Sequence, residues 1–268
     1  MFDIFQYAFM QKAFLVGILL AVIIPLIGVI VVLKRLSMIG DALSHTSLAG
    51  VALGLILGIN PIVGAVVVCM IAAFSIEGIR KALPKYAEIS ISIIMSVGIG
   101  LASVLSGFIE DGTAFNSFLF GSIVAITDTE VVMVIIVTII VVAVFLLYKE
   151  LMFITFDEPG AVLAGVPVKK INFVITLLTA ITVSVAARSV GALMVSSLMV
   201  IPVACAMQLA NSYKKTVIYS VLFALLFTIV GLFLSYYMNL KPGGTIVLTG
   251  VVVLIPLMFV KSIGHARM

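Results

Sequence analysis

Two ionisable side chains, Asp41 and His45, stand four positions apart in the apolar segment GDALSHTSLAG (residues 40–50). In an α-helix of about 3.6 residues per turn, such side chains lie one above the other on the same face. A carboxylate oxygen and an imidazole nitrogen could then contact one ion, and both are suitable ligands for zinc or manganese. The spacing alone leaves an alternative, in which Asp41 caps the helix and His45 has a structural role.

A stripe of small residues lies beside this polar face, about 100° round the helix. It consists of Thr46, Gly50, Gly54 and Gly58, which repeat at every fourth position. Small residues at that spacing let another membrane helix approach closely. The sequence therefore predicts a helix that packs through this stripe, while the adjacent polar face lines a passage or meets a partner.

The composition indicates that this helix belongs to a membrane protein. Of the 268 residues, 64% are hydrophobic and only 10% are charged, whereas soluble domains are about half apolar and about a quarter charged. Cys69 and Cys205 lie in apolar runs, so we expect two small buried hydrophobes rather than a disulfide or a pair of metal ligands. Apolar runs long enough to cross a bilayer predict about nine spanning helices near residues 14–33, 41–58, 62–79, 89–108, 130–148, 171–188, 191–210, 216–238 and 244–260, and the shorter run 113–127 is expected to be re-entrant.

The basic residues predict how the chain is oriented. With the amino terminus outside, 12 of the 15 lysines and arginines fall on the cytoplasmic side, and only Lys12, Arg188 and Lys241 fall outside. Because cytoplasmic loops are enriched in positive residues, we expect a multi-pass protein with its amino terminus outside and its carboxyl terminus in the cytoplasm. This topology also explains the net charge of +4 without nucleic acid as a partner. The acids that flank the short run would then be external: Glu110, Asp111, Asp128 and Glu130.

One cytoplasmic loop, FDEPGAVLAGVPVKK, carries the signals of a short helix. Asp157 can cap this helix, Glu158 and Pro159 occupy its first turn, and Gly165 followed by Pro167 ends it. A short amphipathic helix at this face could be gripped by a partner protein, or it could lie on the lipid headgroups.

The remaining polar residues and absent motifs narrow the function. Glu77 precedes Arg80 and Lys81 by three and four positions, which favours a local ion pair at the cytoplasmic end of its span. His265 lies in the polar carboxyl tail, where we expect it to be solvated. The sequence contains no phosphate-binding P-loop, no HExxH pair and no GxSxG elbow, so neither ATP binding of that kind nor intramembrane hydrolysis is expected. The chain is therefore expected to transport or to scaffold, and a partner or an ion gradient must supply any energy.

The segment RLSMIGDALSHTSLAGVALGLILGINP closely resembles the second-helix signature of the permease subunits of bacterial metal-importing ABC transporters, the zinc, manganese and iron family. The resemblance continues in order through AEISISIIMSVGIGLA, FLFGSIVAI, FDEPGAVLAGVPVKKINF, VGALMVSSLMVIPVACAMQL and SYYMNLKPGGTIVL, and so covers almost the whole chain. Within the family, FMQKA, SHTSLAGVALG and FDEPGAVLAGVPV are most similar to the streptococcal-type zinc permeases.

This resemblance implies an all-α, polytopic bundle similar to a type II ABC importer, with residues 1–268 forming a single permease domain in the bacterial cytoplasmic membrane. It implies a homodimer of the permease, two copies of a separate ATPase subunit and an extracellular metal-binding lipoprotein. The chain itself would have no catalytic activity and no bound cofactor. Its cargo would be Zn²⁺ or Mn²⁺.

The resemblance also assigns roles to residues. Asp41 and His45 match the acidic and histidine positions that are proposed to touch the ion in transit. A transport site must release its ion, so two protein ligands and water are more suitable than a closed cage of four ligands. The cytoplasmic coupling segment of the family maps onto residues 157–168. Its candidate residues here are Asp157, Glu158, Gly165, Val166 and Pro167.

The sequence therefore predicts the permease of a zinc-importing ABC transporter, and a manganese or iron permease is the nearest alternative. A different class, an ion-gradient-driven secondary transporter, would require buried acids midway along several helices. In this chain the acids gather in loops and at helix ends. A membrane scaffold without transport is the third possibility.

Overall fold

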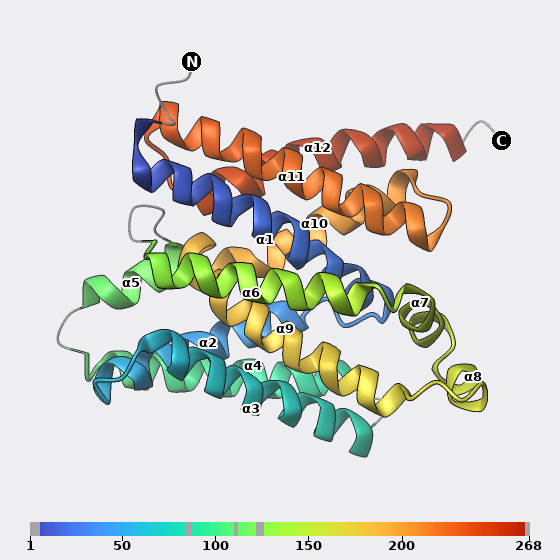
Figure 1. Cartoon of the computed structure of the whole chain (residues 1–268), viewed down its shortest axis with the longest axis horizontal. Helices are drawn as coiled ribbons and strands as arrows, with labels where there is room; N and C mark the ends of the chain where they lie inside the picture. Colours follow the sequence, from blue (N-terminus) through green and yellow to red (C-terminus); the bar gives the residue numbers. More distant parts are fainter. Residues whose placement is uncertain (1–5, 84–86, 110–111, 122–125, 266–268) are drawn as a thin grey trace.

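The computed structural model describes residues 6–83, 87–109, 112–121 and 126–265, and the regular structure in these ranges is helical throughout (Figure 1). Most of the long helices run roughly along the longest axis of the molecule, so that their ends gather at its two extremities. The helices are α1 (Ala8–Leu33), α2 (Ile39–Ile56), α3 (Pro61–Ala82), α4 (Ala87–Ser106), α5 (Gly112–Phe120), α6 (Asp128–Phe145), α7 (Tyr148–Phe156), α8 (Glu158–Leu163), α9 (Val168–Val190), α10 (Ala192–Leu209), α11 (Tyr213–Met238) and α12 (Pro242–His265).

The lengths of these helices confirm the predicted polytopic membrane bundle. Eight of the described helices are long and apolar enough to cross a membrane, and α10 is a shorter apolar helix beside them. The short run 113–127 overlaps α5, whose nine residues are too few to cross a bilayer, and residues 122–125 of this predicted re-entrant run lie outside the described structure. Beyond α6, where the sequence indicated a single span ending near 148, the chain forms the separate helix α7.

Local sequence signals explain several helix boundaries. The side chain of Asn60 caps α3, where Oδ1 accepts a hydrogen bond from the backbone nitrogen of Ile62 at 2.9 Å. A capping box between Thr127 and Glu130 begins α6, two residues earlier than the predicted span. Asn239 ends α11 in the left-handed conformation, with φ of 52°.

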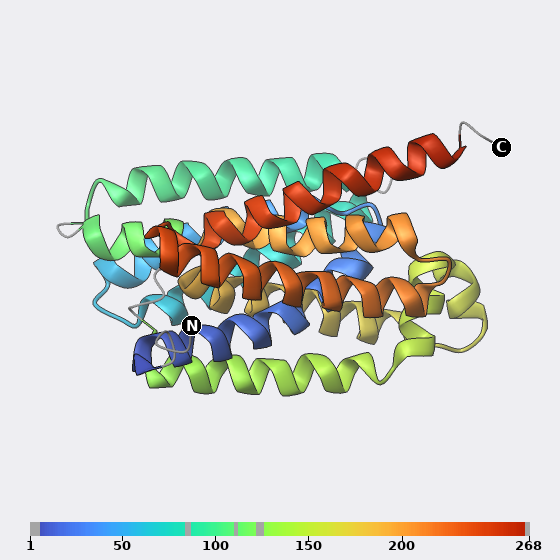
Figure 2. The same ribbon diagram turned by 90° about the horizontal axis from the view of Figure 1, so that it is seen from above.

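Successive spans run in opposite directions, so the chain ends lie at opposite extremities of the bundle (Figures 1 and 2). The extremity at the right of both views carries α7, α8, the carboxyl end of α3 and the turn between α10 and α11. We call it the α8 end. Some of the charged residues used for the orientation lie outside the described structure, as do two side chains at the carboxyl end: Lys85, Glu110, Asp111 and Arg267, with the side chains of Lys261 and His265.

Helix α2 is the most enclosed span, and this enclosure positions the polar pair predicted from the sequence. In its apolar window 72% of the residues are buried, compared with 17% in α12 at the periphery. Gly50 permits the close contact with α3, because a Cβ atom there would lie 2.5 Å from the carbonyl oxygen of Gly64. On another side, a Cβ atom on Gly98 of α4 would lie 2.8 Å from the backbone nitrogen of Thr46. Backbone contacts of this kind hold α2 between α3 and α4.

The two remaining glycines of the small-residue stripe, Gly54 and Gly58, differ in what they contact. Gly54 also meets α3, since a Cβ atom there would lie 2.8 Å from the Cα atom of Pro61. Gly58 has a different role, because it follows the end of α2 with φ of 67° and no atom lies within 4 Å of its Cβ position. It allows the chain to turn toward α3, and the residues that the structure describes make no helix contact at this position. Cys69 and Cys205 are both buried and free, as predicted.

Candidate metal transit site

Asp41 lies in the first turn of α2, where the partial positive charge of a helix amino terminus favours a carboxylate. The residue is half-buried. Its Oδ1 atom accepts a hydrogen bond of 2.5 Å from the hydroxyl of Ser196, which lies on α10. One carboxylate oxygen is thereby oriented by the neighbouring helix, while the other forms no hydrogen bond or ion pair with the residues that the structure describes and is available to an ion.

His45 lies one helical turn further along α2, on the same face as Asp41 and about 6 Å along the axis. It is half-buried, and its imidazole forms no hydrogen bond or ion pair with the part of the chain that the structure describes. Between the two positions, Ser44 is buried with an Oγ atom that also has no protein hydrogen-bond partner there. The face of α2 that carries Asp41 and His45 therefore offers a carboxylate and an imidazole, and the buried hydroxyl of Ser44 lies about 100° round the helix from His45.

Within the described ranges, no group of three or more histidine, cysteine, aspartate or glutamate side chains could hold a metal ion together. Asp41 and His45 are thus two potential ligands, and the described part of this chain supplies no third strong ligand beside them. Such a partial site is suited to a passing ion, whose other positions would be filled by water, by weak oxygen ligands or by a second copy.

The predicted coupling segment forms a compact helical turn at the α8 end. Asp157 caps α8, with its Oδ1 atom accepting a hydrogen bond of 2.9 Å from the backbone nitrogen of Gly160. Gly165 has φ of 81°, a conformation that favours glycine. The next residue closes the turn, since the backbone nitrogen of Val166 donates to the carbonyl of Ala161 at 3.0 Å, and Pro167 precedes α9.

The α8 helix exposes apolar side chains at an extremity of the bundle. Leu163 is 89% exposed and Val162 is more than half exposed, as is Phe156 at the end of the preceding helix α7. Basic residues of neighbouring elements, including Lys169 and Lys170, are exposed beside them. Apolar side chains surrounded by charged ones are typical of a protein contact, so this surface favours the partner interpretation of the segment.

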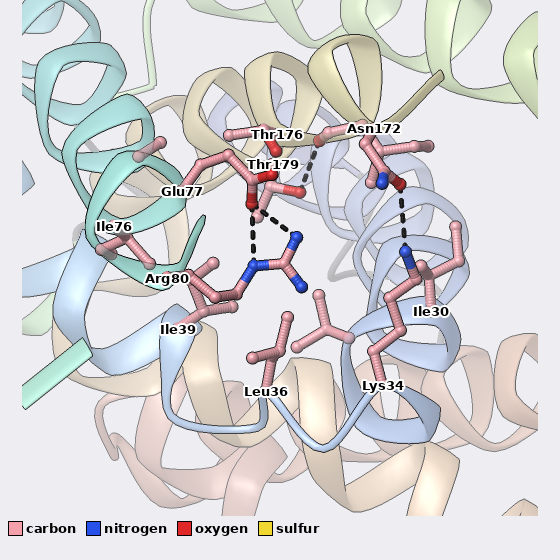
Figure 3. Close-up of a pocket in the computed structure, with 13 residues that line it drawn as sticks. Ile30, Lys34, Leu36, Ile39, Ile76, Glu77, Arg80, Asn172, Thr176 and Thr179 are labelled. Atoms are coloured by element: carbon pink, nitrogen blue, oxygen red, sulfur yellow. Dashed lines mark hydrogen bonds and ion pairs between the residues drawn. The ribbon is translucent and has the colours of Figure 1, made fainter. Parts of the chain in front are cut away.

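The predicted ion pairs of Glu77 are present at the carboxyl end of α3, and Figure 3 shows the one with Arg80. Its carboxylate lies 2.7 Å from Arg80 and 3.2 Å from Lys81. Arg80 and Glu77 line a small pocket together with Lys34, which lies at the end of α1 and on the opposite wall of the pocket.

At the other extremity of the bundle, the three basic residues that fall outside the positive-inside pattern all have partners. Lys12 lies 2.7 Å from Asp128, and Arg188 lies 3.2 Å from Glu130. The ammonium of Lys241 lies 3.8 Å from the centre of the Phe120 ring on α5. These contacts join α1, α5, α6, α9 and α12 at this end.

The sequence did not predict two of the contacts described above, the Asp41–Ser196 hydrogen bond and the Glu130–Arg188 ion pair. Ser196 is 155 positions from Asp41, and nothing in its apolar surroundings distinguishes it from other helical serines. Glu130 was expected to be an external acid without a nearby base, yet it is buried against Arg188 from a distant helix. A buried carboxylate requires a partner. The sequence features that could have indicated this pair are the helix-capping position of Glu130 and the presence of Arg188 without a neighbouring acid in sequence.

The comparisons with known proteins agree with this architecture. The profile described as the ABC 3 transport family matches residues 6–261. A "probable metal transport system membrane protein" of Treponema pallidum is 36% identical, with 98% of this chain and 99% of that protein covered. The "manganese transport system membrane protein MntC" of Listeria monocytogenes is 33% identical, with 92% and 89% covered. The "high-affinity zinc uptake system membrane protein ZnuB" of Haemophilus influenzae is 30% identical, with 91% and 94% covered.

A solved structure extends the agreement to the three-dimensional arrangement. The structure titled "PsaBC from Streptococcus pneumoniae in complex with Fab" contains a chain that superposes with a TM-score of 0.84 at 29% identity, covering 95% of this chain and 92% of that one. The predicted likeness to permeases of ABC importers is therefore confirmed in both sequence and fold. The chain belongs to the ABC 3 transport family, as a membrane permease subunit of an ABC transporter and not as its catalytic subunit.

Proposed function

We propose that the chain forms the membrane path of an importer of divalent transition metal, and that Asp41 and His45 contact the ion in transit. The observation that carries this proposal is the placement of both side chains on one face of the most enclosed spanning helix, with Asp41 oriented by Ser196. Ionisable groups are costly within a membrane and are usually retained there for transport. The names of relatives in metal uptake systems support the same cargo.

Manganese is the first candidate metal, and zinc, which the sequence favoured, is the second. The names of the similar relatives include several manganese systems at 32–33% identity and a zinc system at 30%. The donor set is compatible with manganese, because a carboxylate and water suit this harder ion. The imidazole of His45 keeps zinc in consideration, since zinc is commonly bound by histidine.

We propose that two copies of the chain assemble with two ATPase subunits and receive metal from an extracellular binding lipoprotein. A second copy facing the first would add its own carboxylate and imidazole to a site that is incomplete in one chain. The ATPase would bind the segment 157–168, a role supported by the exposed apolar side chains of α8. The α8 end would then face the bacterial cytoplasm and the amino terminus the outside, as the distribution of basic residues favours.

Metal uptake by the purified transporter tests the proposal. The permease and its ATPase are reconstituted in liposomes with the binding protein, and uptake of radioactive manganese and zinc is measured with and without ATP. We expect ATP-dependent uptake, with manganese competing more strongly than zinc. Uptake by the permease alone, driven by an ion gradient, would instead support the secondary transporter. Absence of uptake of either metal under all these conditions would contradict the proposed cargo.

Gly165→Leu is expected to weaken binding of the ATPase about tenfold. The glycine has φ of 81°, where a leucine costs about 1–2 kcal/mol and would rearrange the turn that carries Val166 and Pro167. A Cβ atom at this position meets no other atom, so the effect would come from the backbone conformation and not from a clash. The measurement is the amount of ATPase that copurifies with the tagged permease.

Two variants control this experiment. Gly165→Asn should retain more ATPase, because asparagine tolerates the left-handed conformation better than leucine. Gly78→Leu should retain all of it, since this exposed helical glycine of α3 also has open space around its Cβ position. Equal copurification of the ATPase with Gly165→Leu and with the wild type would exclude a role for this turn.

A further inference from the structure

Lys34 lies at the carboxyl end of α1 and contacts two other elements of the α8 end, α9 and α8; Figure 3 shows the first of these contacts, with Asn172 of α9. Its ammonium donates a hydrogen bond of 3.0 Å to Oδ1 of Asn172 on α9, and it lies 3.5 Å from Oε2 of Glu158 on α8. The amide nitrogen of Asn172 in turn donates to Oε1 of Glu158 at 3.1 Å. The three side chains therefore form a closed triangle of contacts, which we call the Lys34 triangle, between α1, α8 and α9.

Lys34 is nearly buried, so its charge needs the partners that this triangle supplies. The side chain is only 12% exposed and lines a small pocket with apolar neighbours, including Ile30, Leu36 and Ile76. Burial lowers the pKa of Lys34, whereas the charge of nearby Glu158 raises it. A buried ammonium is costly without a partner. The other cation that lines the pocket, Arg80, already pairs with Glu77, so Glu158 is the carboxylate left to compensate Lys34.

A short rigid turn connects Lys34 to the helix that carries Asp41. The backbone nitrogen of Leu36 donates to the carbonyl of Val31 at 2.9 Å, and the nitrogen of Ile39 donates to the carbonyl of Leu36 at 2.9 Å. Arg35 has φ of 60°, a conformation that a non-glycine residue adopts only when its surroundings impose it. A turn fixed by these hydrogen bonds would carry a displacement of Lys34 into the first turn of α2.

We propose that Lys34 is a positioning residue, which transmits movement of α8 through Glu158 to α2 and so to the metal-binding face. The inference rests on the proposed function, because it assumes that an ATPase moves α8 and that α2 holds the ion. The triangle connects the element that meets the ATPase to the element that carries Asp41. Without it, the ATPase would still bind and hydrolyse ATP, but its movement would reach α2 less completely.

The test uses the complete transporter in liposomes and measures metal uptake and ATP hydrolysis in the same sample. Lys34→Met is expected to lower the metal carried per ATP about tenfold, with ATPase copurification retained. Glu158→Gln should lower this ratio to the same extent, and because Glu158 also belongs to the segment proposed to bind the ATPase, its ratio is measured per copurified ATPase. The double variant should lose no more than the worse single variant, because both changes remove the same contact. Lys34→Arg, which can still donate to Glu158 and Asn172, should restore most of the uptake. Lys214→Met, at an exposed lysine of α11, serves as the matched control and should transport normally.

The outcomes separate this inference from the function on which it depends. Normal transport by Lys34→Met, or independent and additive losses in the double variant, would overturn the inference while leaving metal import intact. Absence of uptake by the wild type would overturn the proposed function and the inference with it. If Lys34→Met fails to fold, Glu158→Gln and Asn172→Ala decide the question: equal losses of metal per ATP support the triangle, and unchanged ratios refute it.

Discussion

Asp41→Asn is expected to lower metal uptake about a hundredfold, equivalent to about 2.7 kcal/mol in the transport barrier. The substitution keeps the size of the side chain and an oxygen that can accept the hydrogen bond from Ser196, but it removes the negative charge that attracts the cation. His45→Ala should have a similar effect, because it removes the only nitrogen ligand on this face of α2. Uptake of radioactive metal by the reconstituted transporter measures both effects.

Glu88→Gln is the matched control for the loss of charge. Glu88 also lies in the first turn of a spanning helix, α4, but its side chain is exposed. Replacement of this carboxylate by the glutamine amide should therefore leave metal uptake unchanged. Folding of each variant is checked by thermal unfolding in detergent and by copurification of the ATPase. If Asp41→Asn and His45→Ala fold and transport like the wild type, the ion does not pass over this face of α2. If both instead fail to fold, the two residues are structural.

Gly50→Leu is expected to destabilise the bundle by about 3 kcal/mol, the upper part of the range for overpacked interiors. A Cβ atom at this position would lie 2.5 Å from the carbonyl oxygen of Gly64 and 2.7 Å from the Cα atom of Ala65. Both are backbone atoms, so relief requires α2 and α3 to separate and cannot come from a rotated side chain. We therefore expect a lower unfolding temperature in detergent and a smaller monodisperse fraction.

Gly100→Leu controls for the change from glycine to leucine within a membrane helix. Gly100 lies in α4 with no atom within 4 Å of its Cβ position, so a leucine there would face open space. Its unfolding temperature should match or exceed that of the wild type, because leucine has the higher helix propensity. Equal stability of the Gly50→Leu and Gly100→Leu variants would show that α2 and α3 separate without cost.

Local sequence patterns predicted the spans and the polar pair because the relevant forces act within one helix. A bilayer requires about 20 apolar residues for each crossing, and the distribution of lysine and arginine separates the loops into two sets. The Asp157 cap was equally predictable, since a side chain that bonds the backbone three positions ahead depends on local sequence alone. Helix α7 was not predicted, because its residues follow the predicted end of the span at 148 and mix charged with apolar side chains, a composition that the sequence analysis assigned to a cytoplasmic loop.

Local sequence patterns could not predict the contacts between segments that are distant in the sequence. Many serines in membrane helices bond to their own backbone, so the sequence could not single out Ser196 as the donor to Asp41. Lys34 was counted only as one cytoplasmic positive charge, whereas in the structure it is nearly buried against α8 and α9. Register and rotation of packed helices determine these pairs, and both depend on the shapes of all neighbours together.

The paired charges at the extremity opposite α8 have a consequence for how an ion would be captured. Lys12 and Arg188 each lie against a carboxylate, and Lys241 lies over an aromatic ring. If this extremity faces outward, these side chains would neither strongly repel an arriving dication nor leave their partner carboxylates free to attract it from a distance. These paired side chains would then contribute little to long-range steering, and entry past them would depend on a carrier that delivers the ion to this extremity. The rate of loading should accordingly follow the concentration of that carrier more closely than the concentration of free metal.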